Sequence, residues 1–217
     1  MSPLRILHVT AGFVALLVFI IPLVTKKGGR YHTRAGWVYV GAMVTVSLTA
    51  WTIAAGQLLD ATSDRHTSAA FLGFLGVLSA DVLWFGLRAV RFPARKERHK
   101  KSIDLFAPAI TILLALGVIA IGIRSGNILL SAFPLLGVLL GAQQITYWRS
   151  VPEHKSHSVV AHISGMISAV IGTLTAFAVF GGPRLMGQQN APVWLWIAPT
   201  IVLVPLIFYF QKSYKKS

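Results

Sequence analysis

Long apolar segments alternate with short polar connections along the whole sequence. Stretches that lack Asp, Glu, Lys and Arg and are long enough to cross a bilayer cover residues 6–25, 35–59, 105–123, 125–148, 156–183 and 185–211. One further stretch, residues 66–87, is interrupted only by Asp81. Because a membrane-spanning helix needs about 20 predominantly apolar residues, the pattern predicts an all-α integral membrane bundle of seven transmembrane helices.

The length and composition agree with this prediction. Seven spans account for roughly 140 residues, so we expect residues 1–217 to form a single transmembrane helical domain. Only 12% of the residues are charged and the mean hydropathy is +0.69, whereas soluble domains carry about 25% charged residues. Gly165 and Gly172 are typical of sites where helix backbones approach closely in lipid. Pro199 and Pro205 predict that the last span is the least regular one.

The basic residues are divided unequally between the connections. The net charge is +14, and 16 of the 20 Lys and Arg residues fall on the inner side if the N-terminus is outside. The outer side keeps only Arg5, Arg65, Arg124 and Arg184. The positive-inside rule then predicts an outer N-terminus and a cytoplasmic C-terminus, in a multi-pass protein of the cell inner membrane. A nucleic-acid-binding surface needs its basic residues on one polar face, so we expect the charge to face lipid and not nucleic acid.

Histidines near the ends of the spans are the main candidates for chemistry. His8 and His66 lie at outer ends, His32 and His99 at inner ends, and His162 about two turns into the sixth span. Two histidines at similar depth on neighbouring helices can supply both axial ligands of one haem iron. The pattern predicts b-type haem, with His8 and His66 as outer ligands, His32 and His99 as inner ligands, and His162 as a further candidate. Such a protein would take electrons from a donor and move them across or at the membrane.

A second hypothesis begins with Asp81, which is costly in lipid and is expected to face protein. Arg88 lies two helical turns further along the same helix, so an Asp81–Arg88 link is the structural explanation. The functional explanation combines Asp81 with His32 and His162 in a polar pocket in the inner half of the bundle. Two His and one Asp suit a zinc ion with an open coordination position, serving hydrolysis or transport.

A third hypothesis requires no cofactor. Histidine at a membrane rim can act only as an amphipathic anchor. His99, between Arg98 and Lys100, and His154 and His157, in the connection before the sixth span, are expected in solvated loops. The protein would then be a non-catalytic membrane module that binds lipid, a partner or a small-molecule ligand. All three hypotheses are open at this point.

Two regions carry a resemblance to a known family. The motif L-H-V-T-A-G at residues 7–12 and the turn K-K-G-G-R-Y-H-T-R-A-G at residues 26–36 resemble the opening of small bacterial membrane proteins of the domain of unknown function 2306 family. His162 and Met166 form an H-x-x-x-M stretch similar to that near the family's end, while Thr33 replaces a frequent Arg. The resemblance implies a small membrane bundle and marks His8, His32 and His162 as family features. The paired histidines also resemble those of transmembrane b-type cytochromes and ferric reductases.

Overall fold

The computed structural model describes residues 2–99, 101–187 and 191–215, which contain helices and connections but no strand. Seven helical stretches are long and apolar enough to cross a membrane: Pro3–Val24, Arg30–Leu59, His66–Ala89, Ile103–Arg124, Ile128–Arg149, His157–Leu185 and Val193–Tyr214. The all-α class and the seven candidate spans are therefore confirmed for this part of the chain.

Four of these stretches are built from more than one helical segment. The first consists of α1 (Pro3–Val18) and α2 (Ile20–Val24), and the fifth of α6 (Ile128–Ala132) and α7 (Leu135–Arg149). The sixth contains α8 (His157–Ala176), the π-helical turn η1 (Phe177–Gly181) and α9 (Gly182–Leu185). The seventh contains the 3-10 turn η2 (Val193–Trp196) and α10 (Ala198–Lys215). The others are the single helices α3 (Arg30–Leu59), α4 (His66–Ala89) and α5 (Ile103–Arg124).

Proline explains two of these interruptions. Pro22 has no N–H to donate to the carbonyl of Val18, the residue at which α1 ends. Pro134 lies between α6 and α7 and likewise cannot bond the carbonyl four residues earlier. The last span, expected to be the least regular one, is interrupted near its start between η2 and α10, whereas α10 itself continues through Pro205 without a break.

The start of the last span also differs from the sequence prediction. We expected residues 185–211, but the sixth stretch extends to Leu185 and the seventh begins at Val193. Gly187 between them has a φ of +69°, a left-handed conformation that glycine adopts without steric cost. The chain reverses within a stretch that contains no charged residue, so a prediction based on uncharged runs could not locate the start of the last span.

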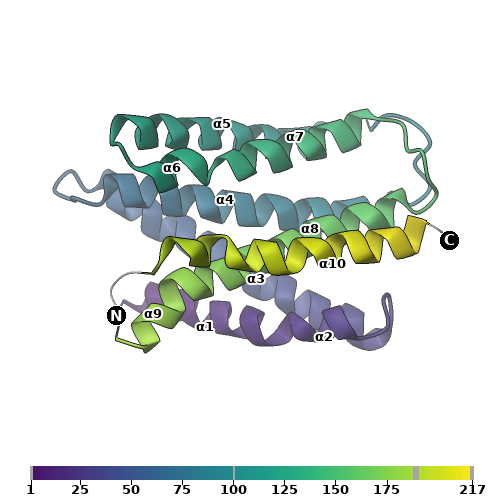
Figure 1. Cartoon of the computed structure of the whole chain (residues 1–217), viewed down its shortest axis with the longest axis horizontal. Helices are drawn as coiled ribbons and strands as arrows, with labels where there is room; N and C mark the ends of the chain where they lie inside the picture. Colours follow the sequence, from purple (N-terminus) through teal and green to yellow (C-terminus); the bar gives the residue numbers. More distant parts are fainter. Residues whose placement is uncertain (1, 100, 188–190, 216–217) are drawn as a thin grey trace.

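Helices α4 and α8 pack against each other in the middle of the bundle, with α5 and α7 on one side and α1 and α2 on the other (Figure 1). Helix α3 packs against α1 and α4, while α8 packs against α4 and α10. Helices α5 and α7 pack together on the far side of α4. The connections after α2, α4 and α7 lie at the same end as the C-terminal end of α10 (Figure 1). We call this the basic end, because most of the basic residues belong to it by sequence; two of them, Lys100 and Lys216, lie outside the described residues.

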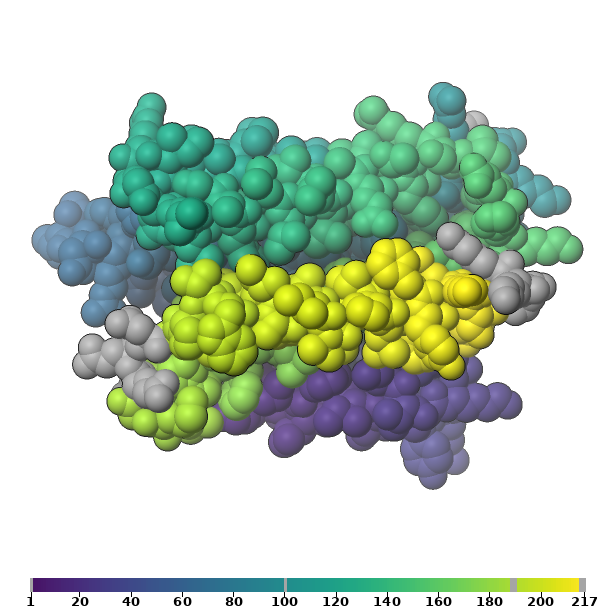
Figure 2. Space-filling view, in the orientation of Figure 1, coloured from purple at the N-terminus to yellow at the C-terminus, as the bar shows by residue number. Residues whose placement is uncertain are grey.

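The outward surfaces of the helices are apolar, as expected for contact with lipid. Large exposed side chains are found around the bundle, including Leu17, Leu113, Leu139, Ile201 and Phe208. Figure 2 shows α10 lying between the α1–α2 span and the α6–α7 side of the molecule. Inside, Tyr39, Met43, Val82, Ile167 and Val170 form the core between α3, α4 and α8. The candidate site adjoins this core.

Candidate functional site

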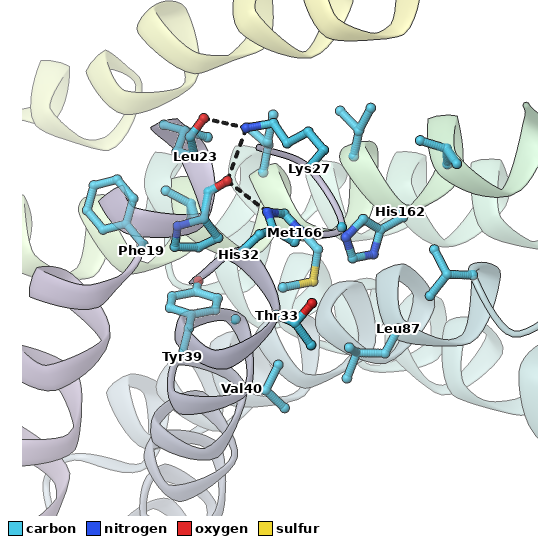
Figure 3. Close-up of a pocket in the computed structure, with 18 of the residues that line it drawn as sticks. Phe19, Leu23, Lys27, His32, Thr33, Tyr39, Val40, Leu87, His162 and Met166 are labelled. Atoms are coloured by element: carbon cyan, nitrogen blue, oxygen red, sulfur yellow. Dashed lines mark hydrogen bonds between the residues drawn. The ribbon is translucent and has the colours of Figure 1, made fainter. Parts of the chain in front are cut away.

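A cavity of about 470 Å³ lies towards the basic end, lined by parts of α2, α3, α4, α8 and α10. Its walls are mainly apolar and include Phe19, Val40, Leu87, Ile167 and Phe210. The nitrogen-bearing side chains that line it are Lys27, His32, Trp37 and His162, of which three are labelled in Figure 3. The cavity therefore combines apolar surface with a few polar groups, as ligand sites commonly do.

His32 is held by the end of α2. The turn before α3 contains Gly28 with a φ of +72°, which lets the chain reverse so that the first turn of α3 lies beside α2. The ring nitrogen Nδ1 of His32 lies 3.0 Å from the carbonyl oxygen of Pro22. That carbonyl is among the last four of α2 and has no partner within the helix. The His32 ring thus satisfies a helix end and is fixed in orientation.

His162 is held in the same way by the end of α4. Its Nδ1 lies 2.9 Å from the carbonyl oxygen of Gly86, one of the last four carbonyls of α4. Glycines permit this contact, because a Cβ at Gly165 would lie 2.6 Å from the Cα of Gly86. The close crossing of α4 and α8 therefore brings the His162 ring within reach of the neighbouring helix.

The two rings adopt the same hydrogen-bonded state. A carbonyl oxygen only accepts, so Nδ1 of each ring must carry the proton and donate it. In the neutral imidazole, Nε2 is then the nitrogen with a free lone pair. The ring centres of His32 and His162 lie 6.3 Å apart, with the ring planes inclined by 59°. Both residues line the cavity, which therefore has two imidazoles able to act as ligands.

Lys27 is the cationic side chain of this cavity. Its Nζ donates to the carbonyl oxygen of Pro22 at 3.0 Å and to that of Leu23. It also lies 4.8 Å from the ring centre of Phe210 on α10. Partial burial lowers the pKa of the Lys27 ammonium from its ordinary value. Pro22 thus accepts from both Lys27 and His32, as Figure 3 shows.

Asp81 lies outside the cavity and contacts α7. Its carboxylate is buried, and the Nε2 of Gln144 on α7 donates to its Oδ2 at 3.0 Å. It does not line the cavity that His32 and His162 share. Within the described residues, no three His, Cys, Asp or Glu side chains are grouped so that they could hold a metal ion. The structure thus brings together two members of the predicted zinc set and leaves Asp81 apart.

The expected link between Asp81 and Arg88 is wrong, because Arg88 pairs with Asp104 on α5. Arg88 Nε donates to Asp104 Oδ1 at 2.7 Å, and Nη2 donates to Oδ2 at 2.6 Å. His99 Nε2 donates to the same Oδ2 at 2.7 Å, and its ring lies 4.4 Å from that of Trp148. His99 is therefore part of a buried charged cluster and is not adjacent to His32 in the cavity.

The predicted outer haem pair is not assembled either. His8 Nδ1 lies 2.8 Å from Thr49 Oγ1 on α3. His66 is exposed, and its Nε2 donates to the carbonyl oxygen of Asp60 at 2.9 Å. Among the residues that the structure describes, no ring contact joins these two histidines. His8 therefore bonds to a neighbouring helix, and His66 bonds to the loop that precedes it.

The two remaining histidines belong to the connection before α8. His154 is exposed, as expected for a loop residue. His157 is not a solvated loop residue: it begins α8, is half-buried, and its Nδ1 lies 3.0 Å from the hydroxyl oxygen of Tyr147. Sequence reasoning also missed Lys27, although its place in the glycine turn directly before His32 was the available signal.

Comparison with known proteins does not assign the chain to a family. No family model, no curated protein and no solved structure matches the chain. The resemblance of its ends to the domain of unknown function 2306 family stays a prediction. A functional proposal therefore depends on the geometry of the cavity.

Proposed function

We propose that this protein binds one b-type haem in the cavity at the basic end, through Nε2 of His32 and Nε2 of His162, and serves electron transfer at that face of the membrane. One observation carries the proposal: two imidazoles on different helices line one apolar cavity, each with Nδ1 bonded to a backbone carbonyl. Ligating histidines are usually oriented by such a bond from their other nitrogen.

The number of protein ligands favours haem over zinc. A haem supplies four nitrogens to its iron, so the protein needs to add only two axial ligands. A catalytic zinc site generally has three protein ligands, and no third His, Cys, Asp or Glu joins His32 and His162 among the described residues. A metal ion about 2 Å from each of two opposed imidazole nitrogens separates the ring centres by roughly 6 Å, and the observed separation is 6.3 Å.

The cavity also suits the rest of the group. A bound haem would supply a one-electron couple between ferric and ferrous iron. The chain's contribution is to fix both imidazoles, to surround the group with apolar walls and to limit access of water, which tunes a redox potential. We propose one haem and not two, because His8 and His66 have different partners.

The basic end supports an orientation of the protein in the membrane. With 16 of 20 basic residues on that side by sequence, the positive-inside rule places it in the cytoplasm, with the N-terminus outside. The protein would be a multi-pass protein of the cell inner membrane, with its haem towards the cytoplasmic face and its electron donor on that side. The basic loops would contact anionic lipid.

Paired histidine variants test the proposal. The protein is purified in detergent from cells supplied with a haem precursor, as wild type, His32→Ala, His162→Ala and His154→Ala. We expect a low-spin haem spectrum for the wild type and for His154→Ala, because His154 is exposed and does not line the cavity. The two cavity variants should give a high-spin spectrum or an empty protein.

The same preparations separate the alternatives. Zinc without colour would favour the metal hypothesis, and neither zinc nor colour would favour a module that binds lipid or a partner. A module that binds lipid or a partner is also compatible with the observed bonds of His32 and His162 to backbone carbonyls. The haem and zinc contents therefore decide between the three hypotheses. Equal haem content in all four proteins would show that His32 and His162 are not the ligands.

A further inference from the structure

Among the described residues, Lys27 is the only Lys, Arg, Asp or Glu that lines the cavity of about 470 Å³. It is half-buried, and no ion pair in the described part of the chain includes it. An ammonium that is partly removed from water without a counter-charge is destabilising. A ligand that brings a negative group to this position would compensate the charge.

The ammonium still has capacity to bind such a group. Lysine has three N–H donors, and two of them go to the carbonyl oxygens of Pro22 and Leu23. These carbonyls fix Nζ on the same turn that holds His32, because Pro22 accepts from both residues. The positions of the cation and of the His32 ring are therefore coupled, as Figure 3 shows.

The polarity of the cavity changes along its length. Lys27 and Gly28 on the turn, and Tyr214 near the end of α10, border it on the side of the basic end. Val40, Ile167 and Val170 border it towards the core. A planar apolar ligand with acidic groups along one edge fits this gradient, with the acidic edge towards the turn and the apolar edge towards α3 and α8.

We infer that Lys27 is a specificity residue of the site and binds a propionate carboxylate of the haem, which sets the orientation of the macrocycle. The inference rests on the proposed function, since it concerns the same cavity. In the bound state, the third N–H of Lys27 donates to a carboxylate oxygen while the other two stay on the carbonyls of α2. Lys27 thus selects a ligand with an acidic edge over a neutral one of the same shape.

The test compares haemin with its dimethyl ester, in which the carboxylates are neutralised and the iron chemistry is kept. Both are titrated into haem-free wild type, Lys27→Gln, Lys27→Arg and Lys26→Gln, and binding is followed by the Soret band. Gln retains N–H donors for the carbonyls of α2, so the fold is expected to persist. Lys26 is an exposed neighbour on the same turn and serves as the matched control.

We expect the wild type to prefer haemin over the ester by about tenfold, the effect of one charge-assisted hydrogen bond. Lys26→Gln should keep this preference, Lys27→Arg should retain most of it, and Lys27→Gln should lose it through weaker haemin binding alone. A wild-type ratio near one, or an unchanged ratio in Lys27→Gln, would overturn the role of Lys27 and leave the haem proposal standing. Wild type that binds neither compound would overturn both.

Discussion

The rings of His32 on α3 and His162 on α8 lie 6.3 Å apart, each bonded through Nδ1 to a carbonyl at the end of a neighbouring helix. Helix ends leave four carbonyls without intrahelical partners, and here two of these carbonyls fix two imidazoles. The same bonds leave both Nε2 atoms available for a ligand. The hydrogen bonds that satisfy these helix ends thereby orient two imidazoles in one cavity.

The close crossing of α4 and α8 should be necessary for this arrangement. Gly165→Ala would place a Cβ 2.6 Å from Gly86, so α8 must move away from α4. We expect a loss of about 1–3 kcal/mol in the free energy of unfolding and a reduced haem content. Gly172→Ala on the same helix is the control, because its Cβ would have Ser79 Oγ at 3.6 Å as its nearest neighbour. Equal thermal stability of the two variants in detergent would contradict this account.

The two buried carboxylates should differ in their importance for stability. Asp104 accepts from Arg88 and His99, so Asp104→Asn leaves a buried guanidinium without its counter-charge. Removal of one partner from a buried pair costs about 3–5 kcal/mol.

Asp81 provides the matched comparison. Its carboxylate accepts a hydrogen bond from the neutral Gln144, and none of the ion pairs between described residues includes it. An asparagine can accept the same bond, so Asp81→Asn should change stability by less than about 1 kcal/mol. Thermal unfolding of both variants checks the contrast. A larger loss of stability from Asp81→Asn than from Asp104→Asn would contradict the stabilising role of the cluster formed by Arg88, His99 and Asp104.

The preference for haemin over its ester should also depend on pH. Partial burial lowers the pKa of Lys27 below its ordinary value of 10.5. The preference should therefore be greatest while Lys27 is protonated and should fall as pH rises through its lowered pKa. His32 and His162 serve both compounds equally, so the ratio reports on Lys27. A ratio that is constant up to pH 11 would exclude an ammonium as the selecting group.

The orientation can be tested with single cysteines, because the sequence contains none. Asp64→Cys lies in the exposed connection between α3 and α4, and Lys155→Cys lies in the exposed connection at the basic end. We expect a membrane-impermeant maleimide to label intact cells at position 64 and not at position 155. The reverse pattern would invert the orientation. A reporter fused after Ser217, outside the described residues, should likewise behave as cytoplasmic.

The sequence was sufficient to predict the seven apolar spans, because each run is bounded by charges or glycine turns. It was not sufficient to place the start of the last span, since the reversal at Gly187 occurs in a stretch without charges. Pro22 and Pro134 lie at breaks between helical segments, but Pro205 is accommodated within α10. Proline alone therefore did not determine where the spans are interrupted.

The site was harder to predict than the spans. The sequence offered His32 and His162 as candidates among several histidines, but which candidates meet depends on the order of helices around the bundle. The ring of His162 lies 6.3 Å from that of His32, on a helix that packs closely on α4 through Gly86 and Gly165. His99 bonds to Asp104 because its loop folds back onto the end of α7, where the N–H of His99 donates to the carbonyl of Trp148 at 2.9 Å. Sequence spacing does not encode such contacts between distant helices.

The most direct test of the central claim is the reduced-minus-oxidised visible spectrum of the purified wild-type protein, combined with a haem count per chain. The account predicts Soret and alpha bands of a low-spin b-type haem, at about one haem per chain. A colourless protein after expression with abundant haem precursor and after titration with haemin would contradict it.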